Sequence, residues 1–376
     1  MKNQASQKHG RILAVLFVMM LLLPAPLWLL LAPVMDNANH ENRTLASFPT
    51  TDTSIEEWPA AFEDWLNDHA PFRNEFMSLN GRLNWTVGTL DSSDVLLGKD
   101  HWLFLKDVSD SKSISDYQGL TAYTEAELAD FTDTLSTLQN RLAEYGTRLV
   151  VVIAPAKEGV YSQYMPDSIP VVSRPTRVQT LAGELIGAGV PLVWPQQTLI
   201  DLSAERQVYY KYDTHWNEVG AYQAVTQAEA LLGHNLTPLE DCEVTVSQEQ
   251  KALTDLANVS AVWTLCQDDL YYSVDAPRAE QISCTPDGYR MHWQGTGEES
   301  LLMLRDSFGE MMAPFLCAGY DQSVVLHTAA VTVDVINEEM DGLPDVIVLE
   351  AAERYSDNLL GQGKLLLAWL DELEEN

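Results

Sequence analysis

From residue 124 onward, apolar residues follow two alternating patterns. Between Thr124 and Gly146, leucines and a phenylalanine recur at spacings of three and four, which predicts an amphipathic helix, and Thr124 with Glu127 forms a capping box at its start. The next segment, RLVVVIA at 148–154, is an unbroken apolar run typical of a strand buried on both faces. The same two patterns predict further helices at 176–188, 217–232 and 356–373 and further strands at 190–194, 301–304, 323–327 and 346–350.

Strands that are apolar throughout and alternate with helices typically form a mostly parallel sheet with helices on both faces. We therefore predict an α/β fold built as a three-layer sandwich. Sites in such sheets lie at the carboxyl ends of the strands. Three polar segments fall just after predicted strands and are expected to meet at one edge: Pro155-Ala156-Lys157, Asp213 and Ser307. Residues 235–298 fit the alternation poorly and are predicted to form an insertion or cap.

The start of the chain has a different pattern, a single long apolar run. Residues 12–34 carry no charge, and as a helix they would span about 34 Å, enough to cross a hydrocarbon core of about 30 Å with a kink at Pro24 and Pro26. Basic residues precede the run and acidic residues follow it, so residues 1–11 are expected to stay in the bacterial cytoplasm and the rest to be exported. A cleaved signal peptide is the alternative, but no convincing Ala-x-Ala site follows, which favours an uncleaved single-pass signal anchor in the cytoplasmic membrane.

Residues 35–94, which follow the apolar run, are predicted to be a helical lead-in. Tryptophan, phenylalanine and leucine recur there at helical spacing between Trp58 and Trp85, and prolines interrupt them. Two short strands around a turn are then expected within 95–105. We assign residues 95–376 to one domain.

Composition and charge exclude some partners. Lys and Arg number 22 against 55 Asp and Glu, a net charge of −33, and a field of this sign repels nucleic acid, so no nucleic-acid partner is expected. The cysteines match no metal-binding spacing, and no metal or cofactor is expected. Export permits disulfides, most plausibly among the first three cysteines, and the pairing stays open. The four cysteines are Cys242, Cys266, Cys284 and Cys317.

Three residues supply the groups of a Ser-His-Asp hydrolase or acyltransferase. Asp213 and His215 are two residues apart, and in an extended segment they would face the same side. Ser307 lies where an apolar strand gives way to a turn containing Gly309. A serine hydroxyl becomes a useful nucleophile when an imidazole removes its proton and a carboxylate orients the imidazole. We therefore predict that Ser307, His215 and Asp213 are catalytic.

With these residues in place, the chain resembles the exported SGNH-hydrolase-like proteins of bacterial polysaccharide O-acetylation, the AlgJ/AlgX type, and their relatives named for an Asp-His-His-Trp motif. The matching pieces run in family order over nearly the whole exported chain. They are Glu41-Asn42-Arg43, Asp68-His69-Ala70-Pro71-Phe72-Arg73, Gly98-Lys99-Asp100-His101-Trp102-Leu103-Phe104, Pro155-Ala156-Lys157 with Tyr161, Asp213-Thr214-His215-Trp216, Thr254-Asp255-Leu256-Ala257, Arg305-Asp306-Ser307-Phe308 and Glu353-Arg354-Tyr355.

This resemblance implies an SGNH-hydrolase-like fold and a membrane-anchored, exported O-acetyltransferase, or an acetyl esterase, that acts on a cell-surface or exported polysaccharide. It gives Asp213, His215 and Ser307 the triad roles, with the serine last instead of first. The implied acetyl donor is a multi-pass membrane-bound O-acyltransferase, because acetyl-CoA is not free outside the cell. Thr214 replaces a histidine of the family motif and is expected to point away from the site if the segment is extended.

Three more residues are candidates for substrate binding, each with a structural alternative. Lys157 could contact the substrate or could be a solvated residue at the rim of the sheet. Trp216 could stack on a sugar ring or could be part of the core. Arg305 could bind the substrate or could pair with one of the many acidic groups. Asp306, next to the serine, is expected to form hydrogen bonds in the turn.

A non-catalytic glycan-binding or assembly protein with the same fold is the alternative function. Ordinary SGNH enzymes use a glycine amide and an asparagine side chain as oxyanion donors, and neither can be assigned here. A separation of about 2.6–3.2 Å between His215 Nε2 and Ser307 Oγ would favour the enzyme. The acidic charge predicts that a neutral or amino-sugar glycan binds better than a uronic-acid polymer.

Overall fold

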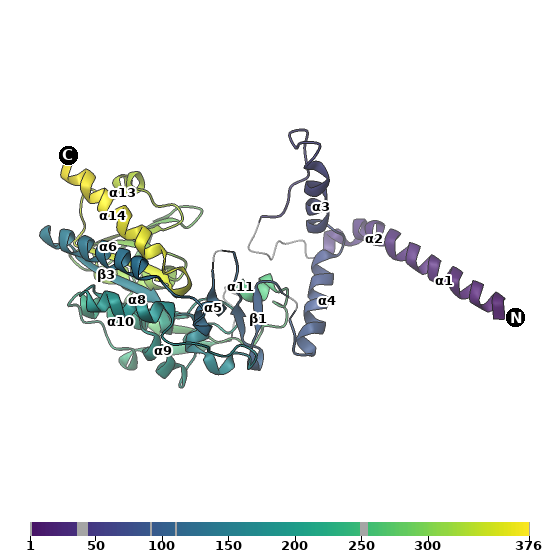
Figure 1. Ribbon diagram of the computed structural model, residues 1–376, viewed down its shortest axis with the longest axis horizontal. Coiled ribbons are helices and arrows are strands. Elements are labelled where there is room, and N and C mark those ends of the chain that lie inside the picture. Colours follow the sequence, from purple (N-terminus) through teal and green to yellow (C-terminus); the bar gives the residue numbers. More distant parts are fainter. Residues whose placement is uncertain (1, 36–43, 91, 110, 249–254, 376) are drawn as a thin grey trace. The chain divides into compact units, whose positions relative to one another are not determined.

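The computed structural model describes residues 2–35, 44–90, 92–109, 111–248 and 255–375 (Figure 1). They form two compact units. One holds Met1–Ser92 and Ala257–Cys266, and the other holds Ser93–Leu256 and Gln267–Asn376. Two pieces of the family resemblance, residues 41–43 and Thr254, lie outside the described residues.

The N-terminal apolar run is helical. Helix α1 (Lys2–Leu22) and helix α2 (Pro24–Leu31) are separated by one residue, Leu23, so the interruption falls beside the first proline, as predicted. A 3-10 turn, Ala32–Val34, follows. By length and composition, residues 11–34 are one helical stretch that could cross a membrane.

Aromatic side chains pack together in the rest of the first unit, which holds α3 (Trp58–Asp68) and α4 (Arg73–Thr86). The rings of Phe48 and Phe62 both lie against Trp65, with centroid separations of 4.9 and 5.7 Å. A Cβ at Gly81 of α4 would lie 2.9 Å from the carbonyl oxygen of Ala261, so the close approach of residues 257–266 requires glycine there. Sequence patterns did not predict that this distant segment joins the N-terminal unit.

The second unit is built on a seven-stranded sheet within the described residues. In sheet order its strands are β4 (Leu192–Val193), β3 (Arg148–Ala154), β11 (Val346–Ala352), β9 (Ser300–Arg305), β10 (Gln322–His327), β8 (Arg290–Gln294) and β7 (Glu280–Cys284). The first five pair in parallel, and β8 and β7 are added antiparallel at one edge. The predicted mostly parallel sheet is confirmed, although the strand predicted at 190–194 is shorter, at Leu192–Val193.

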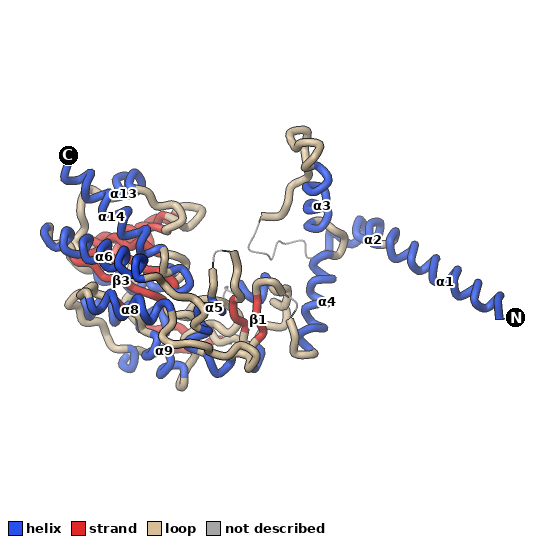
Figure 2. Tube along the Cα trace, viewed as in Figure 1, coloured by secondary structure: helices blue, strands red, loops and turns tan. Residues whose placement is uncertain are grey.

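Alternate residues of the strands face two separate apolar cores. Along β3, Val150 and Val152 belong to one core, and Val151 and Ile153 belong to the other. The first core is covered by α9 (Gln196–Ser203), α10 (Glu218–Leu231) and α12 (Gly309–Leu316), and the second by α6 (Glu125–Glu144), α8 (Arg177–Gly187), α13 (Val333–Glu339) and α14 (Asn358–Glu375). The strands, red in Figure 2, thus run between two helical layers, and the predicted three-layer sandwich is confirmed.

Local signals in the sequence start several of these helices. Thr124 caps α6 through the predicted capping box with Glu127, and Thr176 caps α8 in the same way. Asn217 Oδ1 accepts hydrogen bonds from the N–H groups of Val219 and Gly220, which caps α10 as predicted. This cap fixes the chain immediately after His215.

Residues 235–298, predicted to form an insertion or cap, contribute strands to two sheets. Part of this region forms a small antiparallel sheet, β5 (Glu243–Ser247) with β6 (Tyr271–Asp275), and part extends the main sheet as β7 and β8. All four cysteines lie among the described residues, and no disulfide joins them, so the suggested disulfides are not present. Cys242 precedes β5 and Cys284 ends β7, in different sheets. The two short strands predicted around a turn are β1 (Val95–Leu97) and β2 (Leu103–Leu105), and they pair antiparallel. The remaining α-helices among the described residues are α5 (Ser113–Gln118), α7 (Lys157–Val160) and α11 (Asp255–Val259).

Candidate active site

Ser307 lies in the turn between β9 and α12, at the carboxyl edge of the parallel strands. Asp306 holds this turn: its carboxylate accepts hydrogen bonds from the N–H groups of Phe308 (2.9 Å) and Ala352 (2.7 Å), which confirms its expected role. A Cβ at Gly309 would lie 2.5 Å from Cβ of Arg305, so only glycine allows the helix to begin this close to the strand. The serine is therefore presented by a tightly specified strand-to-helix turn.

His215 and Asp213 reach the same edge from the loop before α10. His215 Nε2 lies 2.8 Å from Ser307 Oγ, and His215 Nδ1 donates to Asp213 Oδ1 at 2.6 Å. The loop is a turn and not the extended segment that we expected: Asp213 Oδ1 also accepts the backbone N–H of His215, at 2.9 Å. Asp213 does not follow a strand of the sheet. The residues two apart meet because the aspartate side chain folds back onto the backbone.

A second carboxylate, that of Asp255, completes the support of this loop. The backbone N–H of Asp255 donates to Asp213 Oδ2 at 3.0 Å. Thr214 donates twice to Asp255, from its N–H at 2.9 Å and its hydroxyl at 2.6 Å. Thr214 therefore does not point away from the site as expected, because the loop is not extended. Asp255 belongs to a segment that the resemblance had marked without giving it a role.

The charges of the site shift the pKa values of its groups. Burial alone would lower the pKa of His215, but the hydrogen bond and charge of Asp213, helped by the charge of Asp255, raise it above the ordinary 6.5. Asp213 is fully buried, which opposes its charge, yet the hydrogen bond from His215 keeps its pKa well below the usual range. Burial and the charge of Asp213 raise the pKa of Asp255 to about 6. Near neutral pH the pair Asp213 and Asp255 is thus anionic beside a more basic imidazole.

Lys157 lies behind the site and is 3% exposed. Its Nζ donates to the carbonyl oxygens of Leu103 (2.7 Å), Lys211 (3.0 Å) and Asp213 (2.9 Å), and burial lowers its pKa to about 8. Since an ammonium group has three N–H donors, all three are in use. The structure gives Lys157 the role of a clamp on the Asp213 loop, which differs from both predictions for it, substrate contact and solvated rim.

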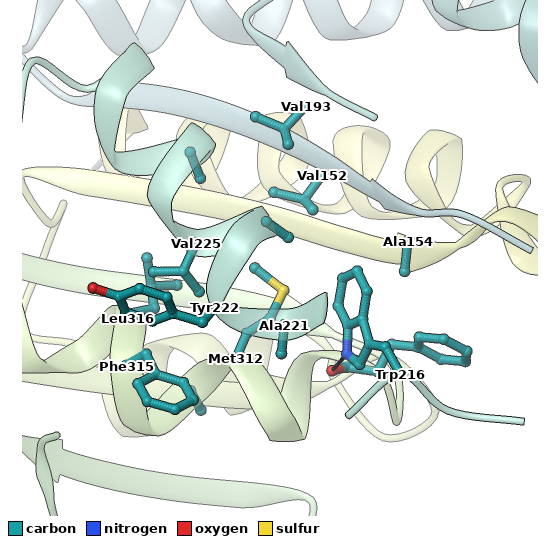
Figure 3. Close-up of a cluster of buried hydrophobic side chains, with 14 of the residues drawn as sticks. Val152, Ala154, Val193, Trp216, Ala221, Tyr222, Val225, Met312, Phe315 and Leu316 are labelled. Atoms are coloured by element: carbon teal, nitrogen blue, oxygen red, sulfur yellow. Dashed lines mark hydrogen bonds between the residues drawn. The ribbon is translucent and has the colours of Figure 1, made fainter. Parts of the chain in front are cut away.

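Trp216 and Arg305 are also buried instead of facing a substrate. Trp216 Nε1 donates to the carbonyl oxygen of Phe308 at 3.0 Å, which ties the His215 loop to the Ser307 turn; Figure 3 shows this bond beside the apolar core. Arg305 donates to the carbonyl oxygens of Gly288 and Asp306 and is 2% exposed. Both residues position the site from inside the fold.

A pocket of about 450 Å³ opens beside the serine and the histidine. This volume is in the range of about 300–1,000 Å³ that is usual for small-molecule sites. Its walls come from β7, β8 and α12, so the region 235–298 supplies one side of the pocket, which the sequence did not predict. The lining residues are His215, Gln281, Met291, Trp293, Ser307, Glu310, Met311 and Pro314.

Two sources of positive potential lie near Ser307. The first N–H groups of a helix have no partner within it, and α12 begins two residues after the serine. The guanidinium of Arg354 lies over the ring of Phe308, 5.1 Å from its centroid, and its charge acts to lower the pKa of His215. Both favour negative charge that develops beside the serine.

Asp213, His215 and Asp255 also place one ligand atom each within 4.8 Å of one another, a spacing that could hold a cation. Both ring nitrogens of His215 already have partners, Asp213 and Ser307. A histidine shared between a carboxylate and a serine hydroxyl is arranged to move a proton. The geometry therefore fits acid–base chemistry better than metal binding.

Residues 95–280 match the family model described as SGNH hydrolase-like domain, acetyltransferase AlgX. Among curated proteins the chain is similar to the probable alginate O-acetylases AlgJ of Pseudomonas syringae pv. tomato (27% identical over 206 residues, 52% of this chain and 49% of the relative) and Pseudomonas aeruginosa (25% over 226 residues, 59% and 54%). The matches thus span about half the length of these relatives.

Similar solved structures are the O-acetyltransferase domain of Pseudomonas putida AlgJ (17% identity, TM-score 0.43, 71% of this chain and 92% of that chain) and Bacillus cereus PatB1 (14%, 0.48, 71% and 97%). The region matched by the family model includes Asp213 and His215, whereas Ser307 lies beyond it, in the turn between β9 and α12. Over residues 95–280 the chain is therefore similar to the SGNH hydrolase-like domain of acetyltransferase AlgX.

Proposed function

We propose that this protein is a serine-dependent O-acetyltransferase that modifies an exported polysaccharide. The observation that carries the proposal is the contact of 2.8 Å between His215 Nε2 and Ser307 Oγ, with Asp213 at 2.6 Å on the other ring nitrogen. The similarity to AlgJ proteins, which are probable alginate O-acetylases, supports the same reaction class.

In the first half of the reaction, His215 takes the proton of Ser307 as Oγ attacks the carbonyl carbon of an acetyl donor. The negative charge on the acetyl oxygen is stabilised by the N-terminus of α12. The bond from the carbonyl carbon to the leaving group then breaks, and protonated His215 returns the proton to that group. The product is an acetyl ester on Ser307.

In the second half, a sugar hydroxyl in the adjoining pocket attacks the acetyl ester. His215 takes the hydroxyl proton, the bond between the carbonyl carbon and Ser307 Oγ breaks, and the proton passes to Oγ. Asp213 stabilises the imidazolium in both halves. Attack by water in place of the sugar would give an acetyl esterase.

The proposed location is the bacterial cytoplasmic membrane, with residues 11–34 as a single-pass anchor and the catalytic unit outside. The acetyl donor would be a multi-pass membrane-bound O-acyltransferase that passes acetyl groups across the membrane. Residues 1–11 would remain inside.

Hydrolysis of nitrophenyl acetate by the full-length protein in detergent tests the chemistry. Ser307→Ala should lower the rate by at least about 10³-fold, and wild type but not the variant should gain the mass of one acetyl group on Ser307. Ser162→Ala, a change at an exposed serine, is the matched control. Equal rates for wild type and Ser307→Ala would refute the proposed nucleophile.

The alternative is a glycan-binding or assembly protein without turnover. The separation of 2.8 Å between His215 Nε2 and Ser307 Oγ is inside the range expected of a working pair and favours the enzyme over this alternative.

A further inference from the structure

The pocket beside Ser307 has one wall that takes no part in the chemistry. Met291 and Trp293 of β8 and Met311 and Pro314 of α12 provide an apolar surface next to the nucleophile. The ring of a tryptophan and the sulfurs of methionines offer broad, polarizable contact area. The carbon-bound hydrogens of a sugar ring fit such a surface, so an acceptor sugar can lie flat against this wall with a hydroxyl toward Ser307.

The polar groups in the lining are few. Apart from His215 and Ser307, they are the amide of Gln281, the carboxylate of Glu310 and the buried indole N–H of Trp293, and among the described lining residues none is Lys or Arg. Both Gln281 and Glu310 can hydrogen-bond sugar hydroxyls, and Glu310 can also pair with a sugar ammonium group. Nothing in this lining offers a positive partner to a sugar carboxylate while His215 is neutral, which is its state as a base.

The charge of Glu310 is available to a ligand. Its side chain is 65% exposed, and Arg305 Nη1 lies 3.8 Å from its carboxylate. That guanidinium is buried and donates to two carbonyl oxygens, as described above. A uronate placed in the pocket would thus meet a like charge in addition to the overall acidic field.

We propose, on the basis of the function proposed above, that the acceptor sugar in this pocket is a hexose or amino sugar without a carboxylate. Trp293 and Met311 hold its apolar face, and Glu310 excludes uronates. The alginate named for the relatives is a uronate polymer and is not expected to be an acceptor here.

The test is acetyl transfer from nitrophenyl acetate to oligomers of glucose, glucosamine and mannuronic acid of equal length, read by mass spectrometry with full-length protein. Wild type should use the first two with at least about tenfold higher kcat/KM than the mannuronate oligomer. Glu310→Lys should raise the ratio of mannuronate to glucose transfer by about fivefold, because it inverts an exposed charge at the site.

Glu280→Lys is the matched control, because it makes the same change in net charge. Glu280 is on β7 next to Gln281, but it does not line the pocket. Glu280→Lys should leave the ratio of mannuronate to glucose transfer near the wild-type value. Because both rates are measured on the same variant, a general loss of activity does not change this ratio. Equal use of mannuronate and glucose oligomers by wild type, or equal ratios in Glu310→Lys and Glu280→Lys, would overturn the inference.

The outcomes separate the two proposals. Ser307-dependent hydrolysis without transfer to any of the three oligomers would overturn the acceptor inference and leave the serine chemistry in place. Absence of Ser307-dependent hydrolysis would remove the proposed function, and the acceptor inference with it.

Discussion

The two sides of the pocket at Ser307 are built in opposite ways. On the catalytic side, Asp213 accepts three N–H hydrogen bonds and its own carbonyl oxygen accepts one from buried Lys157. On the other side, Trp293 and Met311 meet the pocket through apolar surface on β8 and α12. Proton transfer depends on separations of a few tenths of an ångström, whereas apolar contact tolerates small shifts. The proposed proton transfer therefore lies on the side where hydrogen bonds fix the side chains. The proposed contact with the sugar lies on the side where small shifts are tolerated.

The largest effect should come from breaking the constrained side at Asp213. Asp213→Asn removes the charge that stabilises the imidazolium and turns an amide toward N–H donors, so kcat for nitrophenyl acetate should fall by roughly 10³–10⁴-fold. Asp268→Asn is the control, because Asp268 pairs with Lys211 of the same loop but does not contact the triad. Similar rates for the two variants would mean that the carboxylate at 213 does not support His215.

A smaller effect, on stability, should follow from removing the clamp at Lys157. Lys157→Met keeps the length of the side chain but leaves three carbonyl oxygens without their donor, and the free energy of unfolding should fall by roughly 3–5 kcal/mol. Urea denaturation at pH 7 measures this. Lys364→Met, which breaks an exposed pair with Asp130, should cost at most about 1 kcal/mol. If the two variants were equally stable, the clamp would contribute little to holding the site.

The smallest effect is a shift in pH dependence at Asp255. Its negative charge raises the pKa of His215, and His215 must be neutral to accept the serine proton. Asp255→Asn should therefore lower the pKa of His215 and move the acidic limb of kcat/KM to lower pH by roughly half a unit. Thr214→Val loses the hydroxyl contact but keeps the charge, and its limb should stay near the wild-type position. Equal shifts in both variants would assign the effect to positioning and not to charge.

The fold was largely predictable because its signals are local. The apolar run of β3, the capping box at Thr124 and the cap at Asn217 each act within a few residues, and each prediction was confirmed. The three residues that meet at the site could also be named, since a strand-to-helix turn and an Asp-x-His pair are visible in sequence.

The parts that could not be predicted depend on contacts between distant segments. Lys157 was taken for a surface or substrate residue because nothing nearby in sequence shows that Leu103 and Lys211 close over it. Asp255 had no assigned role because its partners lie 41 and 42 residues away. The prediction of an extended backbone at Asp213 was wrong, because the side chain of Asp213 accepts a hydrogen bond from the backbone N–H of His215 and so favours a turn.

The antiparallel pair β8 and β7 occupies an edge of the sheet, and only β10 hydrogen-bonds to it from the parallel strands. The nucleophile and its base lie on either side of this pair in the chain, at residues 307 and 215. Replacement of the hairpin would leave the pairings of the five parallel strands and the contacts of Asp213 untouched. The part of the proposed acceptor surface that β7 and β8 supply could therefore be exchanged while the parallel strands keep their pairing, with loss of the hydrogen bond from Arg305 to the carbonyl oxygen of Gly288.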